Sequence, residues 1–176
     1  MLINNKHYRT IWYEKNSESV KIIDQTKLPF NLDIVSLKKF DDVIKAINEM
    51  KVRGAPLIGA TAAYGVCLAY RELKNKNKIK EKAFEIMNTR PTAFNLFWAV
   101  NKMLSKIDTA LDKIEMEQIL FEEAEKICEH DIEQCKNIKL HSIIDPRSSS
   151  KEVAVNKKVK WFRIYNDKII LYLLRN

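Results

Sequence analysis

Two arginines, Arg53 and Arg90, stand beside prolines in patterns that suit the binding of an oxyanion. In both places the proline is expected to open a helix, because its missing N–H is not needed in the first turn. A helix N-terminus carries unpaired N–H groups and about half a positive charge. A guanidinium beside it can hold a phosphate or carboxylate through two hydrogen bonds. The pattern predicts two anion-binding turns, with Gly54 leaving room for a ligand beside the backbone.

A second interpretation stays open for both turns, in which each arginine binds no ligand and is a surface residue next to an ordinary helix start. Asp24 and Gln25 follow a strand-like run and could bind a substrate hydroxyl or serve the strand end structurally. The aromatic residues interpreted as core rather than as a ligand-stacking surface are Trp12, Phe94, Phe97 and Trp98.

A third group, Cys128, His130, Asp131 and Cys135, contains residue types that bind metals. On a helix, Cys128 and Asp131 are neighbours while His130 points elsewhere, so we interpret the cysteines as core residues beside a surface histidine. The cysteine count is odd and no CxxC pair occurs, which argues against a disulfide framework and a zinc site. This pattern predicts no metal site.

The elements that must position these residues are a small sheet followed by helices. Aromatic and β-branched runs at 7–13 and 19–24 predict a hairpin, and Val35 marks a third short strand. Asp41 or Asp42 is expected to cap the first helix, and 74–78 to form a charged loop. Apolar periodicity predicts helices over about 43–53, 56–73, 79–87, 93–104 and 109–138. The predicted fold class is α+β, mostly α: an N-terminal antiparallel sheet or hairpin and a helical bundle.

Glycine is scarce, with only Gly54, Gly59 and Gly65 in the chain. The last 111 residues contain no glycine, which excludes a glycine-rich nucleotide loop there and disfavours a complete doubly wound domain. In the helix predicted from Pro56, Gly59 and Gly65 would let another backbone approach closely. Since each interior glycine weakens a helix by about 1 kcal/mol relative to alanine, we expect a packing reason for them.

The net charge of +8 is unevenly distributed along the 176 residues. Residues 1–140 hold 23 Lys and Arg against 20 Asp and Glu, and residues 141–176 hold 8 against 3. Because the body is nearly balanced, nucleic-acid binding is not expected. No signal-peptide run opens the chain, and the longest uncharged stretch, 54–70, is better interpreted as a buried helix than as a membrane span. A cytoplasmic protein is expected.

Longer strings of this sequence resemble the methylthioribose-1-phosphate isomerase family, a relative of the initiation factor 2B alpha, beta and delta subunits and of ribose-1,5-bisphosphate isomerase. The matching strings are Asp24-Gln25, Leu28-Pro29, Met50 to Gly59, Ala62 to Gly65 and Thr89 to Leu96. Ala99 after Trp98 favours the isomerase branch. The resemblance covers about residues 3–142, the family's N-terminal domain.

The resemblance implies an enzyme of methionine salvage. Such enzymes convert 5-methylthioribose 1-phosphate into 5-methylthioribulose 1-phosphate, an aldose–ketose isomerisation without a redox cofactor or required metal. It implies that the substrate-binding residues are Arg53, Gly54, Ala55 and Arg90, and that the partner is a small-molecule sugar phosphate. Full-length members form dimers, so a homodimer and a monomer both stay open here.

The family's catalytic cysteine and aspartate lie beyond this domain, the aspartate in a Rossmann-like C-terminal half, and neither motif occurs in this sequence. After Ile143 nothing resembles the family. We therefore expect an isomerase-family domain at 1–142 and a non-homologous basic tail at 143–176. This tail is expected to be out of frame or disordered, or to form a loose hairpin turning at Asn166-Asp167. The expected chain is a truncated member that binds a sugar phosphate without isomerising it.

Two other functions stay open. The chain could be a non-catalytic regulatory or interaction module like the initiation factor 2B relatives, in which case Arg53 and Arg90 would bind no sugar phosphate. Alternatively, the basic tail could bind RNA or a membrane, with an affinity that falls steeply as salt rises. Within the isomerase branch, a ribose-1,5-bisphosphate isomerase-like substrate is the second choice.

Overall fold

The structure, a computed structural model, describes residues 2–3, 6–109, 115–143, 152–155, 159–165 and 168–172. Side chains are described over 8–108 and 115–137. Contacts divide the chain into two units, Met1–Glu129 and His130–Asn176, and each is described by itself. The sequence-based division into 1–142 and 143–176 stays a prediction.

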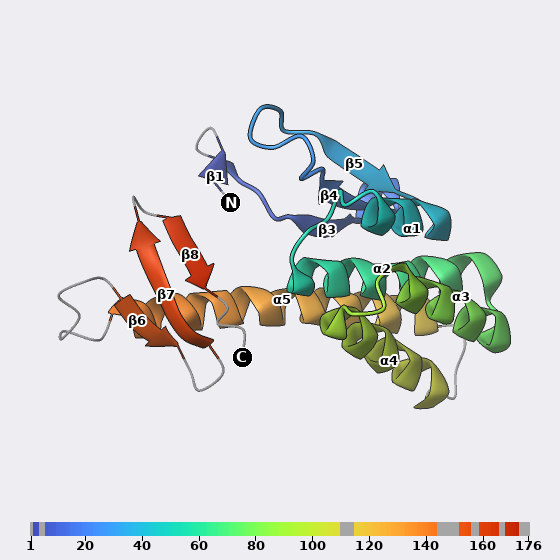
Figure 1. Ribbon diagram of the computed structural model, residues 1–176. Coiled ribbons are helices and arrows are strands. Elements are labelled where there is room, and N and C mark those ends of the chain that lie inside the picture. Colours follow the sequence, from blue (N-terminus) through green and yellow to red (C-terminus); the bar gives the residue numbers. More distant parts are fainter. Residues whose placement is uncertain are drawn as a thin grey trace. The chain divides into compact units, whose positions relative to one another are not determined.

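The first unit opens with antiparallel strands (Figure 1). A short pair, β1 (Leu2–Ile3) and β2 (Lys6–His7), precedes a three-stranded sheet in the order β3-β4-β5. The strands of this sheet are β3 (Ile11–Glu14), β4 (Ser19–Ile23) and β5 (Ile34–Leu37), with a 3-10 turn, η1 (Lys15–Ser17), in the first hairpin. The predicted hairpin and third strand are confirmed.

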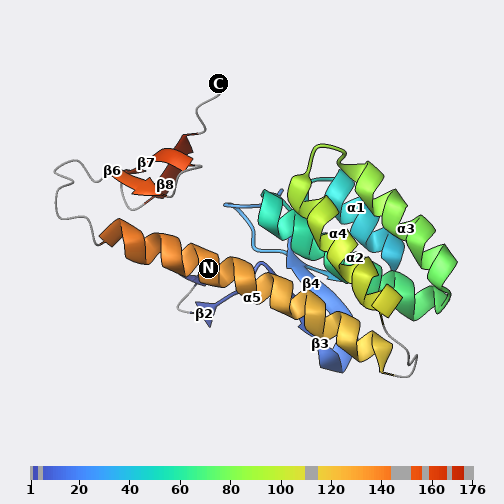
Figure 2. The same cartoon turned by 90° about the horizontal axis from the view of Figure 1, so that it is seen from below.

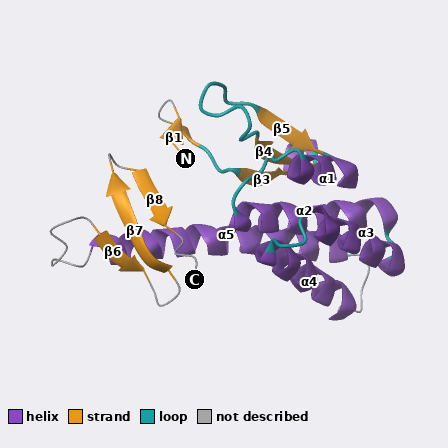
Figure 3. Ribbon diagram, in the orientation of Figure 1, coloured by secondary structure: helices purple, strands orange, loops and turns teal. Residues whose placement is uncertain are grey.

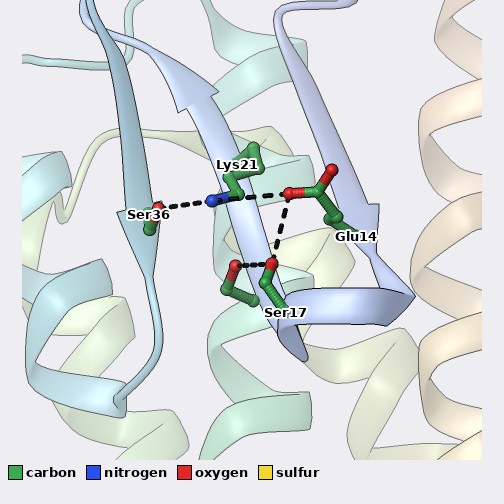
Figure 4. Close-up of polar contacts among 5 residues, drawn as sticks. Glu14, Ser17, Lys21 and Ser36 are labelled. Carbon is green, nitrogen blue, oxygen red and sulfur yellow. Dashed lines mark hydrogen bonds and ion pairs between the residues drawn. The ribbon is translucent and has the colours of Figure 1, made fainter.

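Alternation of side chains gives this sheet a buried face and a polar face. Val20 pairs with Leu37 and Ile22 with Ile11, and all four are buried. On the polar face, the Lys21 ammonium donates to the Ser36 hydroxyl at 2.6 Å and lies 3.4 Å from the Glu14 carboxylate (Figure 4). One lysine therefore links all three strands on the side away from the core.

Five helices follow in the described residues (Figure 3). They are α1 (Phe40–Asn48), α2 (Ala55–Leu73), α3 (Lys76–Thr89), α4 (Phe94–Thr109) and α5 (Met116–Ile143). Helix α2 lies between the sheet on one side and α3 and α4 on the other (Figures 1 and 2). The predicted fold class, a small sheet followed by a helical bundle, is confirmed.

Two helices start at other residues than predicted, because a side chain caps each of them at a different position. Helix α1 begins at Phe40, earlier than the predicted cap at Asp41 or Asp42, because the Asp42 carboxylate accepts from the backbone N–H groups of Lys38 and Lys39 at 3.0 and 2.9 Å. Helix α3 begins inside the predicted 74–78 loop because the Asn75 side chain accepts the first free amides of the helix. Helix α4 runs to Thr109 and α5 begins at Met116, whereas one helix was predicted over 109–138; residues 110–114 lie outside the described residues.

Helix α1 ends in a Schellman motif whose left-handed residue is Met50. The Met50 N–H donates to Ile47 O at 3.2 Å and the Lys51 N–H to Ala46 O at 3.0 Å. Met50 has a φ of 56°, a conformation that glycine adopts with far less strain. This motif fixes the direction in which the chain leaves α1 towards Arg53.

Helices α4 and α5 are joined by a buried carboxylate. Glu123 is 5% exposed and takes ion pairs at 2.9 Å from Lys102, 3.6 Å from Lys106 and 3.9 Å from Lys126. Burial would raise the pKa of the Glu123 carboxyl, but the Lys102 hydrogen bond and the three ammonium charges outweigh it and lower the pKa below its ordinary value of 4.5.

The second unit contains the strands β6 (Glu152–Val155), β7 (Val159–Tyr165) and β8 (Lys168–Tyr172), paired antiparallel in that order. Of the alternatives left open for this part of the chain, a hairpin or disorder, the described residues form the hairpin of β7 and β8, while its predicted turn at Asn166-Asp167 lies outside them. Among the described residues, no helix combines the length and apolarity that crossing a membrane requires. The uncharged stretch that opens α2 is instead a buried helix.

Replacing Met50 by glycine is expected to raise the free energy of unfolding by about 0.5–1 kcal/mol, because glycine relieves the left-handed backbone and gives back only part of that gain in the unfolded chain. Urea unfolding followed by circular dichroism measures it. The control is Glu49→Gly at the neighbouring position, where φ is −78° and glycine brings no relief. Equal destabilisation by both variants would contradict the motif.

The variant Glu123→Gln tests the buried carboxylate through its acid dependence. Because the folded-state pKa is lowered, the stabilising contribution is present above the unfolded value and is lost as pH falls through the folded value. The unfolding free energy of Glu123→Gln should therefore fall less steeply than that of the parent between about pH 5 and pH 3. Glu122→Gln, which neutralises the exposed neighbour, should keep the parental slope; identical slopes for Glu123→Gln and the parent would refute the assignment.

Candidate functional site

The first arginine turn connects α1 to α2 through Gly54. Gly54 is the N-cap of α2, with φ 87° and ψ 136°, a backbone conformation that residues other than glycine rarely adopt. Its carbonyl accepts a hydrogen bond from the Ile58 N–H at 3.0 Å. A Cβ built at Gly54 meets nothing within 4 Å. The position is thus required for its backbone conformation and faces open space.

Arg53 and Ala55 flank this glycine, and both are exposed. The Arg53 Nε–H donates to the carbonyl of Met50 at 3.3 Å. Among the described residues no other partner of the Arg53 guanidinium is found. Ala55 occupies the first helical position, where its amide has no preceding carbonyl to donate to, and Pro56 follows as predicted for a proline in the first turn.

The second arginine turn has a different geometry from the one predicted. Arg90 is the C-cap of α3, and its carbonyl accepts from the Ala93 N–H at 3.0 Å, so Pro91 and Thr92 are the middle of a β-turn. Helix α4 begins only at Phe94, and the prediction that Pro91 opens this helix is wrong. The half-buried Arg90 therefore lies between the end of one helix and the start of the next.

The starts of α2 and α4 lie side by side (Figures 1 and 2). A Cβ built at Gly59, in the second turn of α2, would stand only 2.8 Å from the carbonyl oxygen of Asn95 in the first turn of α4. The close approach predicted from the small residues of α2 is confirmed here. Since each helix start carries partial positive charge, the adjacency of the two starts favours an anion beside them.

Asp24 serves the strand end rather than offering its carboxylate to solvent. It is 4% exposed, and its Oδ1 accepts from the Thr26 N–H at 2.9 Å and the Thr26 hydroxyl at 2.6 Å. Burial would raise the pKa of Asp24, but these two hydrogen bonds and the charges of Lys51 and Lys27 outweigh it and lower the pKa. The structural alternative for Asp24 is the one that the contacts favour.

The residue types that suit metals do not converge. Cys128 is buried, whereas His130 is exposed and its ring Nε2 lies 2.9 Å from the Gln134 amide nitrogen. Cys135 is exposed, so the prediction that it is a core residue is wrong; it lies in the stretch 129–137 of α5, in which no residue is buried. Within the described residues, no group of three His, Cys, Asp or Glu is arranged to hold a metal ion.

The aromatic residues divide between core and surface. Phe97 is half-buried and packs against the core, whereas the half-buried Trp12 lies opposite Lys21 on the polar face of the sheet. Phe94 is 78% and Trp98 42% exposed. The core prediction therefore fits Phe97 and is wrong for Trp12, Phe94 and Trp98. The buried face of α4 is instead made by residues with smaller or more flexible side chains at helical spacing, namely Leu96, Ala99, Val100 and Met103.

Sequence reasoning missed the backbone contacts that hold the first arginine turn. The Gln25 N–H donates to the carbonyl of Lys51 at 2.9 Å, which joins the end of β4 to the segment that leads to Arg53. No periodicity reports such a contact, because it links backbone atoms 26 residues apart. The only signal was the strand-end Asp24-Gln25 motif itself.

Comparison with known proteins places these residues in a family context. The model of the initiation factor 2 subunit family matches residues 51–143. A methylthioribose-1-phosphate isomerase from Methylorubrum populi is 43% identical over 141 residues, covering 80% of this chain and 38% of the relative. The chain spans about two fifths of the length of the curated relatives it matches.

Two solved structures share the fold. The 5-methylthioribose 1-phosphate isomerase of Pyrococcus horikoshii OT3 superposes with a TM-score of 0.69 at 36% identity, over 78% of this chain and 40% of that chain. The delta subunit of translation initiation factor eIF-2B from A. fulgidus superposes with a TM-score of 0.71 at 32% identity, over 77% of this chain and 41% of that chain.

The contact between the two helix starts is tested by Gly59→Ala. A methyl group 2.8 Å from a backbone oxygen forces α2 and α4 apart, and we expect a loss of about 1–3 kcal/mol in unfolding free energy. Denaturant unfolding measures it. Gly54→Ala is the informative comparison, because there the penalty comes from backbone strain at φ 87° with no steric neighbour. A neutral or stabilising Gly59→Ala would show that the two helix starts are not in contact.

Proposed function

The chain belongs to the initiation factor 2 subunit family, and from this premise we propose that it carries the sugar-phosphate-binding part of a methylthioribose-1-phosphate isomerase of methionine salvage. The reaction would convert 5-methylthioribose 1-phosphate into 5-methylthioribulose 1-phosphate. The names of the curated relatives at 39–44% identity support the substrate. The observation that carries the proposal is the adjacency of the starts of α2 and α4, with Arg53 just before the first and Arg90 in the β-turn that precedes the second.

Each residue has a role in this proposal. Arg53 and Arg90 bind phosphate oxygens, since a guanidinium offers paired donors in the geometry of an oxyanion. The Ala55 amide, at the positive start of α2, donates to the same group. Gly54 has no side chain, and the open space beside it lets the sugar approach the backbone.

Isomerisation between an aldose and a ketose moves a proton between neighbouring carbons and needs an acid–base pair within hydrogen-bond reach. Arginines stay protonated near neutral pH and serve for positioning rather than for this transfer. We therefore assign binding, not proton transfer, to the residues described. No cofactor is required by this proposal, and the cytoplasm is the proposed location.

A second function is supported by the likeness to the eIF-2B delta subunit, whose TM-score equals that of the isomerase within 0.02. On this alternative the chain is a non-catalytic module in a protein assembly. It would then bind no sugar phosphate through Arg53 and Arg90. Ligand binding separates the two functions.

Arg53→Ala and Arg90→Ala are each expected to weaken binding of 5-methylthioribose 1-phosphate by about 10- to 100-fold, the size of a lost charge-assisted hydrogen bond. Isothermal titration calorimetry on the purified chain measures the dissociation constants. The matched control is Arg9→Ala, which removes an exposed arginine that pairs with Glu129. Unchanged affinity in both site variants would remove the ligand site.

Turnover is a separate readout on the same samples. In a coupled assay for the ketose product, these 176 residues alone should form no product even though calorimetry shows that they bind the sugar phosphate. Turnover at the rate of a full-length isomerase would contradict the assignment of a binding role only.

A further inference from the structure

The strand-end motif Asp24-Gln25 lies outside the residues assigned above, yet it touches the segment that carries them. Asp24 is one of four buried polar or charged residues within the described part of the chain. Its backbone N–H donates to the carbonyl of Asp33 at 2.9 Å, which closes the base of the loop between β4 and β5. Its carboxylate accepts both Thr26 donors at 2.9 and 2.6 Å and so fixes the turn that follows.

Gln25 lies inside this fixed turn and connects it to the site. Its backbone N–H donates to the Lys51 carbonyl at 2.9 Å, while the Lys51 N–H donates back to Ala46 in α1. Lys51 is thus held from both sides, by the strand end and by the helix end. Val52, which follows, is 0% exposed and anchors the segment in the core.

The position of the Arg53 guanidinium depends on the same segment. Its Nε–H donates to Met50 O, one residue before the carbonyl that Gln25 holds. A guanidinium anchored through Nε presents its two terminal nitrogens on the opposite edge, which is the edge that forms paired hydrogen bonds to an oxyanion. A shift of the 50–52 backbone would move this edge.

We propose that Asp24 is a positioning residue for Arg53, acting through the Thr26 turn, the Gln25 amide and the Lys51 carbonyl. This inference rests on the proposed function in one respect: a preoriented Arg53 guanidinium would bind a phosphate more tightly, because it loses less entropy on binding. The chain of hydrogen bonds stands without that function. The Lys51 ammonium forms an ion pair with Glu49 at 2.8 Å and also attracts the Asp24 carboxylate, as does Lys27.

Asp24→Ala is expected to weaken binding of 5-methylthioribose 1-phosphate at least about fivefold, because the turn loses its acceptor and Arg53 its fixed orientation. Asp24→Asn keeps an oxygen that accepts both Thr26 donors and should rescue most of the affinity. The control Ile22→Val, a core truncation in the same strand, should lower stability and leave the affinity as it is.

A double-mutant cycle separates positioning from general destabilisation. Arg53→Lys retains the cation but has no Nε–H for Met50 O, so in this background Asp24→Ala should cost less than about twofold in affinity. The same loss in both backgrounds, or no loss in the parent, overturns the proposal.

Hydrogen exchange supplies an arm that needs no ligand. Asp24→Ala should speed exchange of the Gln25 and Thr26 amides, while Asp24→Asn keeps the parental protection. Parental protection of Gln25 in Asp24→Ala overturns the proposal whether or not a sugar phosphate binds. If the parent binds no sugar phosphate, the proposed function fails, and the exchange result alone decides whether Asp24 holds this segment.

Discussion

The burial of α2 from Leu57 to Tyr70 is the constraint on which the rest of this structure depends. Every residue from Leu57 to Tyr70 is buried, because the sheet, α1, α3 and α4 all pack on this one helix. A helix covered on all sides needs small residues where neighbours come closest. At Gly65 a Cβ would stand 2.9 Å from Val43 and 3.0 Å from Ile86, just as Gly59 admits Asn95. The glycines that weaken the isolated helix are therefore the ones that allow its neighbours to pack.

The far end of α2 is fixed by Arg71, whose guanidinium has three polar partners. It donates to Glu117 at 2.6 Å, to the Tyr13 hydroxyl at 2.9 Å and to the Glu18 carbonyl at 2.9 Å, and it lies 4.8 Å from the centre of the Phe121 ring. These partners come from the hairpin and from α5. A helix held by an arginine at its last turn and by packing along its length has little freedom to shift at its first turn, where Gly54 lies.

The sequence could predict the elements better than their boundaries. Period-two and helical apolar patterns identified the sheet and α2, since those patterns follow from burial on one face or on all faces. Proline gave one correct and one wrong helix start. Gly54 can adopt φ 87° and lets the chain turn into α2 directly, whereas Arg90, extended before Pro91, ends α3 and closes a β-turn first. An arginine before a proline does not by itself determine whether a helix starts at the proline or a β-turn forms first; at Arg90 the hydrogen bond from Ala93 closes the β-turn. For the site, the composition of the first turn was predictable, but the Gln25–Lys51 hydrogen bond was not.

The two arginines are fixed in physically different ways, and this difference bears on what the site can do. Arg53 follows a segment held by hydrogen bonds on both sides, and its own Nε–H is engaged. Arg90 is placed by a turn between two packed helices, with α4 held against α2 at Gly59. Core packing rather than a long surface loop thus sets the relation of the two turns. Because the packing that stabilises the bundle also sets the positions of the two turns, a ligand bound as we propose would find them already in place, and the entropy cost of ordering them would fall on folding and not on binding.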